Sequence, residues 1–218
     1  MTCPPQRALS DRSGGFEEET VITIIDLGIS NIKSITRGFA TQGFRVRVTR
    51  EPDDVLNAEK LVLPGVGAFP KAMEIVNGLD LTDPIRAHAA ADKPLIGVCL
   101  GMQLLFDESS EHGRTSGLGL VSGRVVRFPR DRPVPHMGWN ELTQTGDCVL
   151  FDGITDRSDF YFVHSYYAEA DNRYVKAVCD HYGTFTAVVQ RGNIFGTQFH
   201  PEKSQRVGLT LLRNFALI

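Results

Sequence analysis

The sequence predicts an α/β fold, in which a mixed, mainly parallel sheet has helices on both faces and continues into a β-rich C-terminal half. The run VITIID at 21–26 is apolar and β-branched, which is typical of a strand buried on both faces. Strand-like and helix-like segments then alternate up to residue 106, as in parallel sheets with crossover helices. Shorter β-rich segments follow and favour an antiparallel extension of the sheet.

The first half is expected to repeat a strand, a turn and a helix. Ser30 or Asn31 is a good N-cap for the first helix, which should end near Thr41. Asp83 and Pro84 suit the first turn of a later helix. The expected elements are strands at 21–26, 44–48 and 61–64, helices at 30–41, 68–76 and 82–91, and a strand that turns into a helix within 94–106.

The second half is expected to be mostly strands, closed by one helix. The expected β-rich pieces are 120–128, 159–169, 173–180, 184–190 and 193–199, and the helix covers 204–217. No linker divides residues 21–218, so we expect one domain there. Residues 1–20 are rich in Pro, Gly, Ser and charge and are expected to form a flexible N-terminal extension.

Composition excludes several classes of function. The 218 residues carry 23 basic and 26 acidic side chains, a net charge of −3, without the basic excess typical of proteins that bind nucleic acid or anionic membranes. No secretory signal or membrane-spanning run is apparent. The four cysteines lack the spacing of a zinc site or a disulfide framework, so we expect no metal, no cofactor and a cytoplasmic location.

Cys99 is the candidate nucleophile. It lies in Gly97-Val98-Cys99-Leu100-Gly101, where a buried strand is expected to turn sharply into a helix. A nucleophile at such a turn needs small neighbours, and the helix N-terminus favours a thiolate. On this pentapeptide alone, a buried and inert cysteine is an equally good interpretation.

His200 and Glu202 are the candidate base and its orienting carboxylate. His200 follows a strand-like run, and Pro201 stiffens its link to Glu202. A His-x-Glu pair is weak alone, because a chance surface pair is common. Cys179 and His181 form a weaker rival site, since no strand-to-helix turn surrounds them.

An oxyanion-binding loop and a substrate contact are also predicted. The segment PGVGAF at 64–69 has two glycines that allow backbone N–H groups to turn toward a ligand, and the N–H of Leu100 is a second donor. The alternative for the loop is a plain strand-to-helix turn. Gln103 lies one helical turn after Cys99 on the same face, where its amide contacts either substrate or nearby backbone.

Five segments together resemble a known family. GVCLGMQLLF at 97–106 and GTQFHPEKS at 196–204 resemble the nucleophile and histidine motifs of glutamine amidotransferases with a Cys-His-Glu triad. PGVGAF, PHMGWN at 135–140 and YFVHSYY at 161–167 narrow the resemblance to the glutaminase subunits of imidazole glycerol phosphate synthase, from histidine biosynthesis. The resemblance spans about 21–218 and implies a flavodoxin-like amidotransferase domain.

The resemblance implies a role for each motif residue. Cys99 attacks the glutamine carboxamide, His200 transfers protons and Glu202 orients the imidazole. The oxyanion is bound at Gly65, Val66, Gly67 and Leu100, with the Val66 N–H pointing inward, and the glutamine head group at Gln103, Ser165 and Tyr166. The products are glutamate and ammonia.

The resemblance also implies a partner. Ammonia passes to a separate (β/α)₈-barrel cyclase subunit, which forms imidazole glycerol phosphate and AICAR, and the two subunits form a heterodimer. The interface is implied at Asn31, Pro135, His136, Met137, Gly138, Trp139 and Asn140. A chain of this length has no room for the barrel, so we expect the barrel on another polypeptide.

One loop departs from the family, and other functions stay open. Residues 26–31 read DLGISN where the family has Asp-Tyr-Gly-x-Gly-Asn, so Leu27 and Ser30 alter a loop near the implied interface. The alternatives are an amidotransferase for another acceptor, a thiol hydrolase acting on γ-glutamyl bonds, and a catalytically silent binding module.

Overall fold

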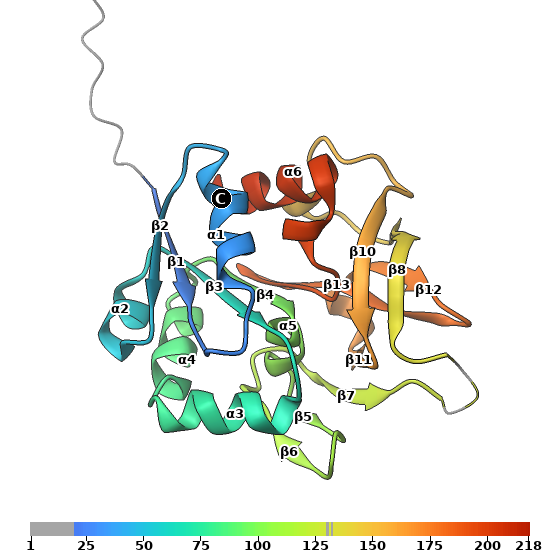
Figure 1. Ribbon diagram of the computed structural model, residues 1–218, viewed down its shortest axis with the longest axis horizontal. Coiled ribbons are helices and arrows are strands. Elements are labelled where there is room, and N and C mark those ends of the chain that lie inside the picture. The colour runs from blue at the N-terminus through green and yellow to red at the C-terminus, as the bar shows by residue number, and fades with distance from the viewer. Residues whose placement is uncertain (1–19, 130, 132) are drawn as a thin grey trace, which may run out of the picture.

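A continuous parallel sheet forms the centre of the molecule in the computed structural model, which describes residues 20–129, 131 and 133–218 (Figure 1). The extension expected at 1–20 therefore lies, apart from Thr20, outside the described residues. The parallel strands follow the order β2, β1, β3, β4, β14. Their bounds are Arg45–Thr49, Val21–Ile25, Lys60–Gly65, Leu95–Cys99 and Ile194–Thr197.

An antiparallel part extends this sheet beyond β14. It runs through β13 (Thr184–Arg191), β11 (Tyr166–Ala170) and β7 (Gly123–Arg127) to the short strands β5 (Glu108–Ser109) and β6 (Thr115–Ser116). Strand β12 (Val175–Asp180) pairs with β13 and with β9 (Thr143–Gln144). A separate antiparallel ribbon joins β8 (His136–Glu141) to β10 (Asp159–His164).

Helices cover both faces of the parallel sheet (Figure 1). Helices α1 (Ile32–Ala40) and α6 (Gln205–Ala216) pack on one face, and α2 (Pro52–Asn57), α3 (Phe69–Gly78), α4 (Thr82–Ala90) and α5 (Leu100–Leu104) on the other. Successive strand residues alternate between the two cores: Ile24 belongs to the α1 side and Ile25 to the α3 side. Short 3₁₀ turns occupy Val149–Phe151, Asn172–Tyr174 and Pro201–Lys203.

These findings confirm the predicted fold class and correct some elements. Asn31, not Ser30, caps α1 with its side chain. Residues 159–169 divide at Ser165 into β10 and β11, which belong to different sheets. Helix α2 and strand β8 were not predicted, because both are short and amphipathic, with periodicities too brief to distinguish from a loop.

The topology brings the candidate residues to one edge of the sheet. Strands β3, β4 and β14 are adjacent and parallel, so their carboxyl ends meet at the same side. That edge is where α/β proteins place ligands. Gly65 ends β3, Cys99 ends β4, and His200 is the third residue after the end of β14. In the part of the chain described, no helix is both long and apolar enough to cross a membrane.

Candidate active site

Cys99 occupies a strained turn between β4 and α5. Its φ of 55° and ψ of −110° place it in a backbone region that non-glycine residues rarely adopt. The neighbouring glycines make this turn possible: a Cβ at Gly97 would lie 2.6 Å from the carbonyl oxygen of Gly101, and one at Gly101 would overlap the carbonyl of Leu63. Backbone geometry thus holds the Cys99 sulfur at the helix N-terminus, as the sequence predicts.

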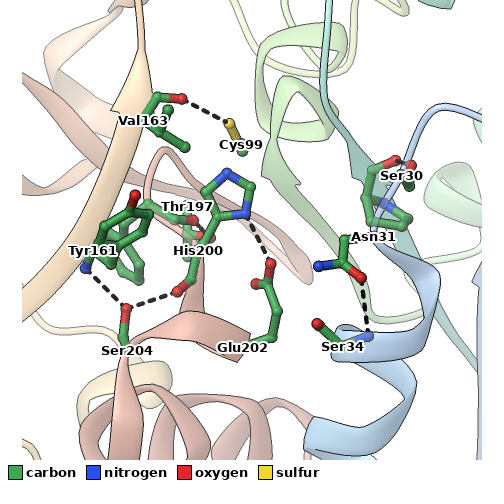
Figure 2. A network of polar contacts seen from close by, with 12 residues as sticks. Ser30, Asn31, Ser34, Cys99, Tyr161, Val163, Thr197, His200, Glu202 and Ser204 are labelled. Atoms are coloured by element: carbon green, nitrogen blue, oxygen red, sulfur yellow. Dashed lines mark hydrogen bonds and ion pairs between the residues drawn. The ribbon is translucent and has the colours of Figure 1, made fainter. Parts of the chain in front are cut away.

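His200 and Glu202 complete the arrangement. The Nδ1 atom of His200 lies 2.8 Å from Oε1 of Glu202, and both side chains are nearly fully buried. Figure 2 shows the imidazole between Glu202 and Cys99, with Nε2 on the side of the sulfur. Within the described residues Nε2 has no other hydrogen-bond partner. It is therefore free to exchange a proton with the sulfur or with substrate.

Ser204 fixes the backbone that carries this imidazole. Its hydroxyl donates to the carbonyl of His200 at 2.7 Å and accepts from the N–H of Tyr161 at 3.0 Å (Figure 2). The N–H of His200 in turn donates to the carbonyl of Tyr161. These bonds tie the 200–204 turn to β10 and leave the ring little freedom to move.

The electrostatics favour a charged imidazole. Burial alone lowers the pKa of His200, but the adjacent Cys99 sulfur and the Glu202 carboxylate outweigh it and raise the pKa to about 10. At neutral pH His200 is thus a positively charged imidazolium, which lies between the Cys99 sulfur and the Glu202 carboxylate. This is the state that pairs with a thiolate nucleophile and later protonates a leaving amine.

A cavity of about 690 Å³ opens directly above the nucleophile. Its walls include Cys99 and most of the residues predicted for the oxyanion and the glutamine head group. They are Val66, Gly67, Leu100, Gln103, Ser165 and Tyr166. A chamber of this size accommodates an amino acid, so the structure brings the predicted catalytic and binding residues together.

The comparisons with known proteins agree with this geometry. A family model for class-I glutamine amidotransferases matches residues 23–218. The imidazole glycerol phosphate synthase subunit HisH of Syntrophotalea carbinolica is 46% identical over 203 residues, covering 89% of this chain and 98% of its own length. The chain belongs to the HisH family of class-I glutamine amidotransferases.

Two further relatives fit the same assignment, and two solved structures share the fold. The HisH subunit of Geobacter metallireducens is 46% identical over 90% of this chain and 97% of its own length, and that of Bacillus cereus 43% over 89% and 93%. A glutamine amidotransferase crystal structure superposes with a TM-score of 0.72 at 17% identity, covering 90% of this chain and 99% of that one. PurLQS from Thermotoga maritima gives a TM-score of 0.69 at 15% identity, covering 90% and 97%. At these identities the superpositions show the fold alone.

The predicted oxyanion loop lines the cavity, but its Val66 N–H is bonded to another loop. The prediction has the Val66 N–H pointing inward, whereas the structure has it donating to the carbonyl of Ile29 at 3.0 Å. The hydroxyl of Ser30 adds a second bond, to the carbonyl of Pro64 at 2.9 Å. That inward orientation is wrong for this arrangement, because loop 26–31 provides a competing acceptor. The oxyanion role of Gly65, Val66, Gly67 and Leu100 stays a prediction, with Leu100 at the start of α5, where the N–H has no acceptor within the helix.

Gln103 bonds to nearby backbone, one of the two contacts that the sequence allowed, and its contact with substrate stays a prediction. Its Nε2 donates to the carbonyl of Tyr166 at 2.9 Å and to Oε1 of Gln198 at 3.0 Å, while its side chain also lines the cavity. Gln198 lies between this amide and the nucleophile, with Nε2 3.9 Å from the Cys99 sulfur. The backbone at Tyr166 is thereby fixed by helix α5, which follows Cys99.

The predicted interface block is strand β8, and its two faces differ. Met137 and Trp139 are exposed, at 62% and 45% of their surface. His136 is 1% exposed, so its side chain faces the interior of this chain, and its predicted place at an interface stays a prediction. Alternation along the strand turns it inward, with Gly138 and Asn140 on the same side. Pro135 lines the cavity, and Asn31 lies at the N-terminus of α1.

Glu111 and Arg127 are among the cavity residues that the sequence interpretation missed. The carboxylate of Glu111 lines the cavity and accepts from the N–H of Phe69 at 2.7 Å, and Arg127 lines the same cavity. Neither stands in a motif that predicts ligand binding, although a carboxylate close after the nucleophile helix is a usable signal. The rival pair fails, because burial raises the pKa of the Cys179 thiol to about 12.

Proposed function

We propose that this chain hydrolyses glutamine to glutamate and ammonia through a thioester at Cys99, and that it delivers the ammonia to a separate cyclase subunit of imidazole glycerol phosphate synthase. The observation that carries the proposal is the buried Cys99, His200 and Glu202 arrangement beneath a cavity of amino-acid size. The names of the 46% identical relatives supply the synthase.

The residues divide the chemistry into two proton-balanced steps. The Cys99 thiolate attacks the carboxamide carbon, and the oxyanion collapses as Nε2 of His200 gives its proton to the departing ammonia. His200, now neutral, takes a proton from water. The resulting hydroxide attacks the thioester and releases glutamate and the thiolate, and His200 is again protonated. Glu202 holds the ring throughout, through the 2.8 Å bond to Nδ1.

Glutamine is held by groups around the cavity. Its head group has one positive and one negative charge, and the cavity offers both Glu111 and Arg127 as well as the backbone at Ser165 and Tyr166. We assign the α-ammonium to the Glu111 carboxylate, whose second oxygen is bonded to Phe69 N–H. The amide end then points toward Cys99.

The cyclase subunit docks on the exposed face of β8. Met137 and Trp139 form an apolar patch there, and Trp139 packs edge-on against Tyr161 with ring centroids 5.9 Å apart. Large aromatic residues commonly anchor interfaces. Enclosed transfer matters because ammonia released into water near neutral pH is protonated and lost as a nucleophile.

The deciding experiment measures glutamate release from glutamine, with and without the cyclase subunit and its ribonucleotide substrate. We expect stimulation by the partner and loss of at least about a thousandfold in Cys99→Ala. Cys148→Ala is the matched control, because Cys148 is a free thiol outside the cavity whose pKa burial raises to about 11. Equal rates with and without the partner contradict the coupled synthase and leave a stand-alone hydrolase.

A further inference from the structure

A chain of hydrogen bonds leads from the glutamine-binding backbone to strand β8. The carbonyl of Tyr166 accepts from Gln103 and also from Nδ1 of His164, at 2.8 Å. Nε2 of His164 lies 3.1 Å from Nδ1 of His136. Nε2 of His136 then lies 2.7 Å from Oδ1 of Asn140. Two buried imidazoles therefore join the cavity wall to the strand that carries Met137 and Trp139.

The carbonyl of Tyr166 fixes the direction of this chain. A carbonyl only accepts, so Nδ1 of His164 carries the proton. Burial lowers the pKa of His164 to about 3, and the ring is therefore neutral, with a lone pair at Nε2. That lone pair accepts the Nδ1 proton of His136. The tautomer of each ring is thus set by its neighbour. The Nδ1 proton of His136 leaves a lone pair at Nε2 of this neutral ring, so the Asn140 amide closes the chain as a donor, with its NH2 group rather than its oxygen turned to the ring.

The surroundings of the two rings exclude simpler roles. His136 stacks on Phe162 and His181, with centroids 5.0 and 4.0 Å away, and His164 packs near Phe128 and Phe185 at 5.3 and 5.1 Å. In the described part of the chain, no group of three or more His, Cys, Asp or Glu side chains is arranged to hold a metal ion. An aromatic core of this kind needs no imidazoles for stability, because phenylalanine fills similar space without desolvating polar atoms.

The strand register explains why these two residues meet. His136 and His164 are cross-strand partners in the β8–β10 ribbon, and β10 ends at His164, directly before Ser165 and Tyr166. The opposite side of β8 presents Met137 and Trp139. A small displacement of β8 therefore acts first on His136, then on His164, and then on the backbone that lines the cavity.

We propose that His164 and His136 are positioning residues for glutamine, which hold the Ser165 and Tyr166 backbone and the Gln103 amide in their binding arrangement through a directed hydrogen-bond chain from β8. This inference rests on the proposed function for the identity of the ligand. Neither imidazole takes part in the chemistry at Cys99. Their contribution lies in the affinity for glutamine, and β8 is the element through which a bound partner influences it.

The test measures KM and kcat for glutamine in the complex of the full chain with the cyclase subunit. We expect His164→Phe to raise KM about tenfold and His136→Phe about fivefold, each with kcat changed by less than about threefold, because each variant loses hydrogen bonds between uncharged groups that hold the binding backbone and leaves Cys99 and His200 in place. His136→Asn should return KM to within about twofold of wild type, since its amide replaces the Nδ1 donor. His136→Gln places its amide at the Nε2 position instead, so its KM should stay raised.

His88→Asn is the matched control. His88 is also a buried imidazole bonded to a backbone carbonyl, that of Pro94 at 3.1 Å, but it lies on α4 away from the cavity. Its replacement should leave KM unchanged. A similar KM in wild type and both phenylalanine variants overturns the proposal, as does a KM increase in His88→Asn equal to theirs. If the phenylalanine variants do not fold, equal KM values for His136→Asn and His136→Gln overturn it.

A second measurement separates this inference from the proposed function. Glutamine affinity is determined by calorimetry in the Cys99→Ala background, with and without His164→Phe. A tenfold weaker affinity on adding His164→Phe supports the positioning role even if the wild-type complex makes no imidazole glycerol phosphate. Equal affinities overturn the positioning role even if the synthase reaction is established.

Discussion

The two walls of the cavity are built in different ways. One wall comes from the turns that follow β3 and β4, where Cys99 and Val66 lie, and it presents backbone groups whose geometry depends on glycines. The other comes from β10 and β11, where side chains hold one another through hydrogen bonds between distant residues. The first wall is set by local sterics and the second by strand register.

Two buried histidines, His200 beside Cys99 and His164 on the second wall, make the contrast sharper. His200 is buried between a carboxylate and a sulfur, which raise its pKa to about 10, whereas His164 is buried among aromatic rings, which lower its pKa to about 3. Burial disfavours the charge in both cases, and only His200 has anions to compensate. Within one protein, similar burial thus accompanies an imidazolium beside Cys99 and a neutral imidazole among aromatic rings.

Gly101→Ala breaks the glycine-dependent wall and should have the largest effect. The added Cβ overlaps the carbonyl of Leu63 in the neighbouring strand, which is backbone and cannot rotate away. We expect the free energy of unfolding to fall by about 3 kcal/mol or more, measured by chemical denaturation. Gly78→Ala is the control, because a Cβ there meets nothing within 4 Å, and it should change stability by less than about 1 kcal/mol. Equal stability of the two variants would show that the turn after Cys99 has room to relax.

His164→Phe tests the second wall through the pH dependence of the free energy of unfolding. The pKa of His164 is about 3 in the folded state and about 6.5 in the unfolded state. Below pH 6.5 the unfolded state therefore binds more protons than the folded state, and the free energy of unfolding falls as the pH falls. At 1.4 kcal/mol per pH unit, His164 accounts for about 2 kcal/mol of the difference in unfolding free energy between pH 7 and pH 5. His164→Phe should reduce the measured difference by that amount. The lowered pKa of His88 and His136 leaves some dependence in the variant. An unchanged difference would mean that His164 is protonated in the folded state.

The same contrast explains how much the sequence predicted. The elbow at Cys99 was predictable because its requirements are local: an apolar strand, flanking glycines and a following helix lie within ten residues. The link from His200 to Glu202 is also local. The contact of His136 with His164 joins residues 28 positions apart through a strand that the sequence did not reveal. The orientation of the Val66 N–H depended on Ile29, in a loop that departs from the family pattern.

Trp139→Ala examines the outward side of the same strand. Trp139 is exposed on β8 while His136 is buried on the other face, so its loss should leave the fold and the chain of histidines intact. We expect affinity for the cyclase subunit to weaken about tenfold, or about 1.4 kcal/mol, measured by titration calorimetry. Val149→Ala, which removes a similarly exposed apolar side chain from a 3₁₀ turn, should leave the affinity unchanged. Equal affinities of the two variants would place the interface elsewhere.

Ser30→Ala changes a contact of the first wall, and its effect, on the rate of glutamine hydrolysis, should be the smallest. The Ser30 hydroxyl and the Ile29 carbonyl together hold the 64–67 loop with the Val66 N–H away from the cavity. If Val66 is to stabilise the oxyanion, its peptide must turn, and each bond to loop 26–31 opposes that turn by about 0.5–1.5 kcal/mol. Removing the hydroxyl should therefore raise glutamine hydrolysis without the partner by about two- to tenfold.

A second serine variant is the control for Ser30→Ala. Ser158→Ala removes a hydroxyl that donates to the carbonyl of Thr155, outside the cavity, and should leave the unstimulated rate unchanged. The fully stimulated rate should be similar in all three proteins, because there the loop has already turned and the bond from Ser30 to Pro64 no longer opposes the reaction. An unstimulated rate in Ser30→Ala equal to wild type would mean that the turn of Val66 does not limit hydrolysis, and that the barrier lies in the glutamine-binding wall instead.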